Sequence, residues 1–218
     1  MIITRVEKKD NTNVIIYLDN GEKIYLAYEV ILKNGLRKGV EISESHFHLL
    51  ISENQKFFIK KKAYDYLGKR IHSAYELRTK LLRKKYDSDL INGVIDELRM
   101  GNYLDDSRFT EVFIEEKIRL KSWGRTKLKA ELAKRGIAAD IISTILPEKF
   151  PIEGEEIELA YRLAEKKYLS LKSRNLEQGK LVQKIYTYLM SKGYSFNIGK
   201  KVVEKLFSIS TDEDQTLN

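Results

Sequence analysis

The sequence predicts a mostly α-helical protein in which three three-helix modules follow one another after a small β-rich N-terminal domain. Three observations lead to this fold class. Two β-rich runs near the N-terminus are joined by an Asn-Gly pair. One spacing of apolar residues, typical of helix–turn–helix, occurs three times beyond residue 60. The 218 residues include only two prolines, which stand close together and suggest a linker.

Residues 1–59 are expected to form the β-rich domain, together with short helices. The β-rich runs are residues 2–6, 14–18 and 24–26, and Asp19-Asn20-Gly21 joins the last two, which predicts a hairpin. Residues 29–34 then suggest a short helix that Gly35 ends. Ser43 fits the N-cap of a helix that runs, with or without a break, towards Gly68.

The repeat consists of apolar residues separated by steps of 4, 5, 4 and 4. Steps of four place side chains on one face of a helix, and the step of five crosses a turn. In two of the three turns a glycine precedes the apolar residue, where a helix C-terminus favours a left-handed conformation. The three sets are Leu77, Leu81, Tyr86, Leu90 and Val94; Leu128, Leu132, Ile137, Ile141 and Ile145; and Ile185, Leu189, Tyr194, Ile198 and Val202. The turns are Lys84-Lys85-Tyr86, Arg135-Gly136-Ile137 and Lys192-Gly193-Tyr194.

A further helical segment precedes each helix–turn–helix, which completes a three-helix module. These segments are residues 63–70, 107–120 and 156–168. The resulting domain prediction is 1–59 for the β-rich domain, 60–104, 105–147 and 152–210 for the modules, and 211–218 for an acidic tail. Pro147 and Pro151 mark the predicted linker between the second and third modules.

Two of the predicted helix starts carry recognisable capping residues. Ser73-Ala-Tyr-Glu76 fits a capping box, in which the hydroxyl and the carboxylate satisfy free backbone N–H groups. Asp105-Asp106 places carboxylates at the positive end of a helix dipole. A metal site at this pair is poorly supported, because two adjacent carboxylates do not fill a coordination sphere.

Composition argues against several classes of protein. The chain has no cysteine, so it has no disulfide framework, thiolate zinc site or cysteine nucleophile. Its histidines, His46, His48 and His72, lack the spacing of metal ligands, and there is no glycine-rich phosphate loop. We therefore expect a protein that is not an enzyme and has no catalytic residues, metal or cofactor. Without a signal peptide or an apolar run long enough for a membrane span, a cytoplasmic location is expected.

The excess positive charge lies in the middle of the sequence. Residues 60–135 contain 20 basic and 12 acidic side chains, whereas residues 1–59 and 136–218 are each balanced, so the middle segment accounts for the whole net charge of +8. Its densest part is residues 117–129, with six cations and no carboxylate. This pattern indicates either one basic surface for a polyanion or a solvated helix surface. Trp123, the only tryptophan, either stacks on a base or packs in a helix–helix turn.

Residues 60–145 resemble the RecX family, the regulatory proteins of the RecA recombinase. The N-terminal domain is similar to that of longer RecX proteins, and the third module matches more loosely. Two positions depart from the family pattern: Thr110 replaces a small residue, and Gly124-Arg125 replaces a frequent glycine–proline pair. The stretches that carry the resemblance are Ser73-Ala-Tyr-Glu-Leu-Arg78, Leu81-Leu-Arg-Lys-Lys-Tyr86, Val94-Ile-Asp-Glu-Leu98, Gly101-Asn-Tyr-Leu-Asp-Asp-Ser-Arg-Phe109, and Trp123 through Leu132 with Lys134-Arg-Gly-Ile137.

The resemblance implies an elongated, curved array of helical modules that lies in the groove of the RecA–DNA filament. We expect it to be a monomer that contacts single- and double-stranded DNA and has no membrane partner. It implies inhibition of filament growth, ATP hydrolysis, strand exchange and co-protease activity. The expected role of the basic residues is electrostatic docking, which salt should weaken. The candidate residues are Lys117, Arg119, Lys121, Arg125, Lys127 and Lys129, followed by Arg83, Lys84 and Lys85.

Two other classes of function stay open at this point. A helix-turn-helix regulator could read specific DNA sites, although second helices such as residues 138–145 are poor in the Asn, Gln and Arg that read bases. A helical-repeat scaffold could instead bind a protein through an apolar surface that is insensitive to salt. Competition between specific and random DNA would separate the DNA reader from the filament regulator.

Overall fold

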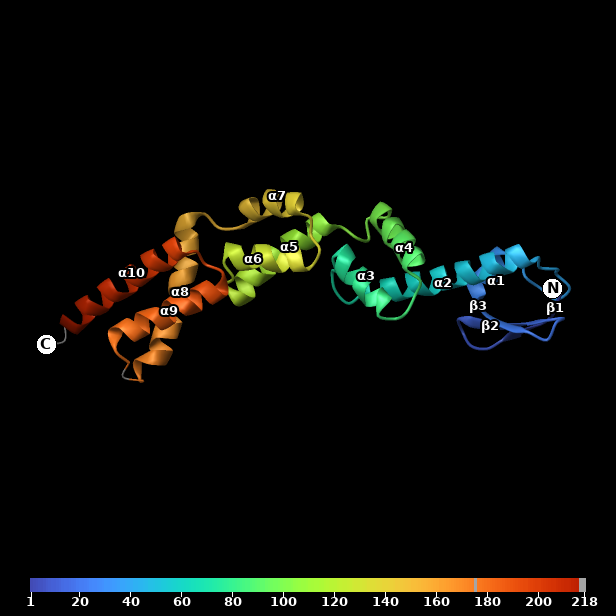
Figure 1. The fold of residues 1–218 in the computed structure, drawn as a ribbon, viewed down its shortest axis with the longest axis horizontal. Helices are drawn as coiled ribbons and strands as arrows, with labels where there is room; N and C mark the ends of the chain where they lie inside the picture. Colours follow the sequence, from blue (N-terminus) through green and yellow to red (C-terminus); the bar gives the residue numbers. More distant parts are fainter. Residues whose placement is uncertain (175, 216–218) are drawn as a thin grey trace. The chain divides into compact units, whose positions relative to one another are not determined.

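The computed structural model describes the backbone of residues 1–174 and 176–215, and the side chains of residues 1–174 and 176–208. These residues form three strands and ten helices, and the protein is mostly helical (Figure 1). The elements are β1 (Ile3–Lys8), β2 (Asn13–Leu18), β3 (Lys23–Ala27), α1 (Tyr28–Lys33), α2 (Glu44–Leu67), α3 (Ala74–Leu82), α4 (Ser88–Met100), α5 (Asp106–Lys121), α6 (Arg125–Lys134), α7 (Ala139–Lys149), α8 (Glu153–Lys172), α9 (Gln178–Lys192) and α10 (Phe196–Gln215).

The chain divides into two compact units, residues 1–104 and residues 105–218. The first unit contains the N-terminal sheet and the first three-helix module, and the second contains the other two modules. The elongated, curved arrangement expected for the whole array stays a prediction. Within the described residues, no helix is both long and apolar enough to cross a membrane.

The predicted hairpin is part of a three-stranded antiparallel sheet in the order β1-β2-β3. Gly21 has a φ of +86°, which explains why the β2–β3 turn needs a glycine. One face of the sheet, with Ile16 and Leu26 fully buried, packs against α1 and the first half of α2. The Ser43 hydroxyl accepts a hydrogen bond from the backbone N–H of His46, so Ser43 is the N-cap of α2 as predicted.

Helix α2 is continuous for 24 residues and serves two cores. Leu50 in its first half is buried against the sheet, whereas Ile59 and Ala63 in its second half are buried against α3 and α4. The predicted boundary between residues 59 and 60 therefore falls inside one helix. The helix is unbroken at this boundary, because both of its halves are stabilised by burying apolar residues.

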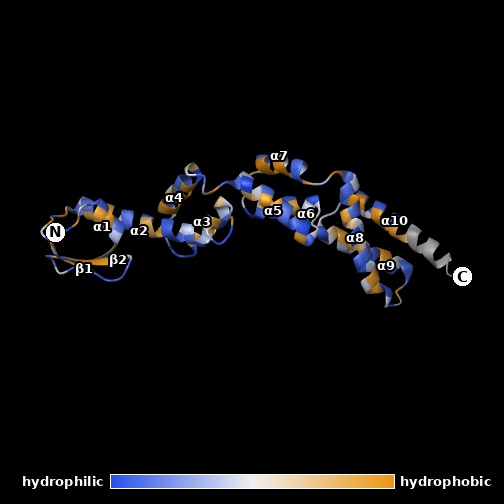
Figure 2. Ribbon diagram, turned by 180° about the vertical axis from the view of Figure 1, so that it is seen from behind, coloured by the Kyte–Doolittle hydropathy of each residue, from blue (hydrophilic) through white to orange (hydrophobic). Residues whose placement is uncertain are grey.

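The repeat describes the cores of the three modules. Twelve of its fifteen residues are buried, and Tyr86, Leu90 and Ile141 are partly buried against the same clusters. The module cores are formed by α2–α4, α5–α7 and α8–α10, respectively. Figure 2 shows the corresponding pattern on the ribbon, where hydrophobic and hydrophilic residues alternate along the helices. Helices α3–α10 each bury apolar residues in the core of their own module, whereas α2 is shared with the core of the sheet.

The turns inside the repeat also have the predicted conformation. Lys85, Gly136 and Gly193 have φ values of +61°, +71° and +91°. Each stands directly before the apolar residue of the repeat that precedes the next helix, and Gly193 is itself the left-handed C-cap of α9. In the first module a lysine takes this conformation, at a cost of about 1 kcal/mol that glycine would avoid.

Both predicted capping sites are helix starts. The Ser73 hydroxyl accepts a hydrogen bond from the backbone N–H of Glu76 at 3.1 Å. The Asp105 carboxylate accepts from the backbone N–H groups of Ser107 and Arg108, at 2.8 and 3.0 Å. Asp105 therefore caps α5, a role that needs no metal.

The linker predicted between the two prolines is shorter than expected. Helix α7 continues through Pro147 to Lys149. Pro147 removes one backbone donor from the helix, but Leu146 and Phe150 on either side of it are buried in the second core, which outweighs that loss. At the other end of the chain, α10 extends to Gln215, so residues 211–215 belong to a helix and not to a separate tail. Residues 216–218 lie outside the described part of the chain.

Candidate functional site

The basic segment of residues 117–129 covers the end of α5, a short turn and the start of α6. Its six cations do not share one environment. Arg119, Lys121 and Lys129 are exposed, and their side chains contact no partner among the described residues. These three are available to an external polyanion. The other three contact their own chain.

Lys117 is held on the surface of the second core. Its ammonium lies 2.6 Å from a carboxylate oxygen of Glu116 and 5.2 Å from the centre of the Phe113 ring. The side chain is only 21% exposed. A nearby carboxylate and an aromatic ring already compensate this charge, so Lys117 is a weaker candidate for docking than its neighbours.

Lys127 joins the second module to the third. Its ammonium donates a hydrogen bond to the backbone carbonyl of Ser191 at 2.8 Å and lies 5.1 Å from the centre of the Trp123 ring. Its backbone packs directly against Gly193, where an added Cβ would come within 2.3 Å of the Lys127 Cβ. Gly193 is therefore required both by its positive φ and by this close approach.

Arg125 makes a second set of contacts across the same junction. It donates to the carbonyl of Pro151 at 3.0 Å, stacks on Phe150 at 4.4 Å and lies 3.5 Å from a carboxylate oxygen of Glu156. Burial raises the pKa of the Glu156 carboxyl, and the Arg125 guanidinium opposes that shift. Arg125 thus stabilises a buried charge.

Backbone hydrogen bonds complete this junction. The N–H of Gly124 donates to the carbonyl of Lys192 at 2.8 Å, and the N–H of Thr126 donates to the carbonyl of Gly193 at 3.1 Å. The hydroxyl of Tyr194 donates to the carbonyl of Ser122 at 3.0 Å, and burial raises the pKa of this hydroxyl. The turn of the third module therefore docks onto the start of α6.

Trp123 belongs to the packing of the second module. Its ring is partly buried against the second core, with its centre 6.1 Å from that of Phe113. Of the two interpretations offered by the sequence, the structure favours packing in a helix–helix turn. Thr110 is fully buried, and its hydroxyl donates to the carbonyl of Asp106 at 2.7 Å.

The secondary basic candidates, Arg83, Lys84 and Lys85, form the exposed turn between α3 and α4 in the first unit. None of their side chains has a partner among the described residues. The left-handed φ of Lys85 places this cation at the point where the chain reverses. The turn is accordingly a compact patch of three available charges.

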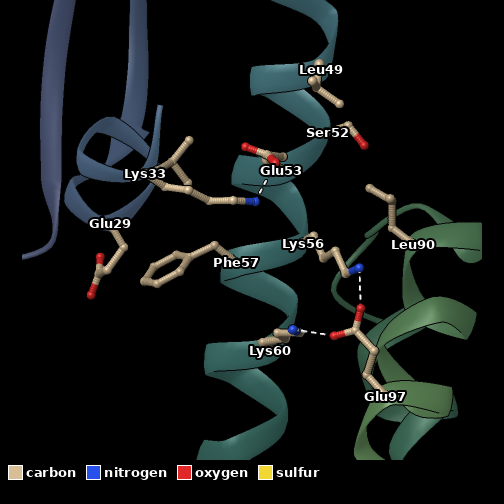
Figure 3. A pocket seen from close by; sticks show the side chains of 11 residues that line it. Glu29, Lys33, Leu49, Ser52, Glu53, Lys56, Phe57, Lys60, Leu90 and Glu97 are labelled. Atoms are coloured by element: carbon tan, nitrogen blue, oxygen red, sulfur yellow. Dashed lines mark hydrogen bonds and ion pairs between the residues drawn. The ribbon is translucent and has the colours of Figure 1, made fainter. Parts of the chain in front are cut away.

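The pocket in Figure 3 lies in the first unit, between α1, α2 and α4, and has a volume of about 630 Å³. Five of its six charged lining residues pair with one another: Lys33 with Glu53 at 2.7 Å, and both Lys56 and Lys60 with Glu97. The sixth, Glu29, has no ion-pair partner among the described residues. Burial raises the pKa of Glu97, but hydrogen bonds from the two lysines outweigh burial and lower it. These pairs connect α2 to its neighbours and leave little charge for a ligand.

The histidines do not form a metal site. His72 is buried, with Nδ1 2.9 Å from the carbonyl of Arg70 and Nε2 2.7 Å from the ammonium of Lys80. Burial lowers the pKa of His72. Within the described residues, no group of three or more His, Asp or Glu side chains could hold a metal ion.

One basic surface lies outside the predicted segment, in the third module. Residues 166–203 contain nine basic side chains and one acidic side chain, Glu177. The charge count over residues 136–218 concealed this stretch, because acidic residues at both ends of the module cancel it. A shorter counting window would have found it.

The fold and the charge distribution define a class of protein: tandem three-helix modules that carry basic residues on their surfaces. Comparison with known proteins gives the family. Models of the first, second and third three-helix domains of RecX match residues 60–98, 105–146 and 154–203, respectively. The chain belongs to the RecX family.

Its relatives share most of its length. The chain is 31% identical over 208 residues to the regulatory protein RecX of Clostridium acetobutylicum, covering 94% of this chain and 96% of the relative. It is 32% identical over 202 residues to that of Clostridium perfringens, covering 92% and 93%.

Solved structures support the same fold. A crystal structure of a regulatory protein RecX matches 93% of this chain and 98% of its own with a TM-score of 0.72, and the RecX structure from Lactobacillus salivarius matches 71% and 97% with a TM-score of 0.61. Both are 22% identical to this chain, so they bear on the fold alone.

Proposed function

We propose that this protein regulates the RecA recombinase by binding the RecA–DNA filament, and that it mainly inhibits the recombinase, ATPase and co-protease activities. The observation that carries the proposal is the match of all three modules to the three RecX domain models, in order along the chain. RecX relatives over nearly the whole length are named regulatory proteins, which supports a role in regulation and not in catalysis.

Docking on the filament uses the unpaired cations. Arg119, Lys121 and Lys129 supply the main charge, and the Arg83–Lys85 turn supplies a second patch. Lys117, Arg125 and Lys127 belong to the same basic segment, but their contacts with the protein itself reduce what they can offer to a partner. The protein acts as a cytoplasmic monomer, and its cations face the filament surface and the phosphates of single- or double-stranded DNA.

The test is the DNA-dependent ATP hydrolysis of RecA on single-stranded DNA, with this protein titrated in at 50 and 200 mM salt. We expect substoichiometric inhibition that weakens at the higher salt concentration. The triple variant Arg119→Gln, Lys121→Gln, Lys129→Gln should need a roughly ten-fold higher concentration for half-inhibition, because three exposed charges that contact a polyanion are removed.

The matched control is Arg108→Gln, Lys134→Gln, Lys149→Gln, which removes the same charge from the same module. These three cations already pair with carboxylates of the chain, so the control should inhibit nearly as well as the unmodified protein. Equal losses in both variants would contradict docking through the chosen residues. No inhibition by folded protein in several-fold excess over RecA would contradict the regulatory role itself.

A further inference from the structure

We propose that the third module carries a nucleic-acid-binding groove between α8 and α9, which holds the phosphodiester backbone of a DNA strand. This surface is separate from the basic segment of residues 117–129 used above. The inference deepens the proposed function, since it names a second contact to the DNA of the filament. It is nevertheless testable with DNA alone.

The groove has a volume of about 710 Å³ and is walled by one face of each helix. From α8 and the residues that follow it come Lys167, Leu171 and Arg174, spaced four and three apart. From α9 come Lys180, Gln183, Lys184, Thr187, Tyr188 and Ser191, spaced alternately three and one apart. Both spacings keep their side chains on one face of a helix. The opposite face of α9, with Leu181, Ile185 and Leu189, is buried in the core.

The charge in the groove is mostly unpaired. Helix α9 contains no carboxylate at all. Lys167, Arg174 and Lys184 have no carboxylate within ion-pair distance among the described residues, and Arg174 and Lys184 are exposed. Among the described residues, Lys180 is the one groove cation with a carboxylate partner, Glu177 at 3.6 Å, in a pair whose side chains are 68% and 75% exposed. Four cations thus line one groove against a single, loosely held carboxylate.

Tyr188 lies in the middle of this surface. Its ring centre is 5.4 Å from the ammonium of Lys167 and 5.3 Å from that of Lys192, so cations from both helices gather around one ring. A partly exposed aromatic ring among cations is the combination that binds single-stranded nucleic acids, where bases stack and phosphates are neutralised.

The composition of the groove favours a phosphate backbone over an acidic protein. Phosphate contacts in protein–DNA complexes come from Lys, Arg, Gln, Tyr and small hydroxyl side chains, which are the polar residues present here. A protein partner would need exposed apolar anchors, but the aliphatic lining residue, Leu171, is only 3% exposed. From Lys180 to Ser191 the helix extends for about 16 Å, which matches roughly five phosphates of one strand.

The groove ends at the junction with the second module. Ser191 lines the groove, and its carbonyl accepts the hydrogen bond from the Lys127 ammonium at 2.8 Å. A strand held along α9 would therefore end near the cations of α6, with both elements inside one compact unit.

The experiment measures the affinity of the full-length protein for a fluorescent 30-nucleotide single strand and for a 30-base-pair duplex, without RecA, between 50 and 200 mM salt. The groove variant is Lys167→Gln, Arg174→Gln, Lys184→Gln. Because each lost phosphate contact reduces the slope of log affinity against log salt by about 0.7 to 0.9, the slope should decrease by roughly 2 to 3. Over this salt range the unmodified protein should lose about 20- to 40-fold more affinity than the variant.

The control variant, Lys200→Gln, Lys201→Gln, Lys205→Gln, removes the same charge from α10, where each lysine faces a carboxylate. It should keep a slope close to that of the unmodified protein. The single variant Lys184→Gln changes one exposed residue and should reduce the slope by about one, which provides a test even if the triple variant folds poorly.

The remaining outcomes separate the possible ligands. Stronger binding of the single strand than of the duplex supports stacking on Tyr188, and equal binding assigns the groove to phosphates alone. Equal slopes for the groove and control variants would overturn the proposal. Displacement of DNA by polyglutamate at equal charge concentration would overturn it in favour of an acidic protein. Because RecA is absent, failure here leaves the ATPase result unaffected, and an ATPase failure leaves this result unaffected.

Discussion

Two basic regions of the second unit use their cations differently. In residues 117–129, where the charge is dense in sequence, three of the six cations contact the chain itself, and two of these, Arg125 and Lys127, hold the junction between modules. Along α8 and α9, where the groove cations are spread over residues 167–184, three of the four have no carboxylate partner among the described residues. The density of charge along a sequence therefore does not indicate which cations are available to a partner. The position of each cation relative to the turns and junctions of the fold decides this.

The largest effect is expected from a substitution that disrupts the junction between the second and third modules, where Lys127 packs against Gly193. Gly193→Ala should lower the free energy of unfolding of the second unit by about 3 kcal/mol or more, because the new Cβ meets the Lys127 backbone and the φ of +91° is strained. Urea denaturation followed by the fluorescence of Trp123, the only tryptophan, would measure it.

Two further glycines separate the causes of this loss. Gly21 has a similar φ of +86°, but nothing lies within 4 Å of the Cβ that alanine would add. Gly21→Ala should therefore lower the free energy of unfolding of the first unit by only about 1–2 kcal/mol. Gly124→Ala lacks a positive φ but meets the Gly193 carbonyl at 2.4 Å, and should cost about 2 kcal/mol. A loss at Gly193 no greater than at Gly21 would show that the junction is not closely packed.

A smaller effect is expected where Arg125 faces Glu156. Arg125→Gln should lower the stability of the second unit by about 2 kcal/mol at pH 7.5, less than for a fully buried pair since the Arg125 side chain is 40% exposed. Without the guanidinium, burial raises the pKa of Glu156 further above its value in the unfolded chain. Protonation then stabilises the fold at low pH, and this contribution disappears as the pH rises through the raised pKa.

The difference between Arg125→Gln and the unmodified protein should therefore grow as the pH rises from 4.5 to 7.5. Urea denaturation at several pH values would show it. Arg125→Gln combined with Glu156→Gln should recover part of the stability and remove the pH dependence. Arg119→Gln, which changes an arginine without a partner among the described residues, is the control. A pH-independent loss would contradict the assigned role of Glu156.

The smallest effect is expected for the available cations. Lys129→Gln should change the stability of the second unit by less than about 0.5 kcal/mol, because the side chain is exposed and unpaired in the described structure. Lys127→Gln should cost about 1–2 kcal/mol, since it loses the hydrogen bond to Ser191 and the contact with Trp123. Thermal unfolding of the two variants side by side would measure the difference. Equal stabilities would remove the distinction between the two kinds of cation.

Much of the fold was predictable because its signals are local. The apolar steps of four and five specify helices and turns, and Ser43, Ser73 and Asp105 cap helices through their own neighbours in sequence. Pro147 misled the prediction because its local cost is outweighed by the burial of Leu146 and Phe150 in a core formed by distant residues. Local signals do not report such packing.

The candidate site was less predictable for the same reason. Nothing near Arg125 or Lys127 in sequence reveals that Glu156 and Ser191 are their partners, 31 and 64 residues further along the chain. The α8–α9 groove depends on which helix faces come together. The sequence identifies the basic residues, but only the structure shows which of them have no partner within the described part of the chain.

Helix α2 limits where the chain can be divided into fragments that fold on their own. One half of the helix completes the core of the N-terminal sheet and the other half completes the first module, so neither has a full set of core residues without it. Cutting the chain at the predicted boundary between residues 59 and 60 would leave both fragments with a frayed end and exposed apolar surface. The sheet and the first module should thus unfold together as one cooperative unit, and hydrogen exchange should give the buried amides in both halves of residues 44–67 the same free energy of opening.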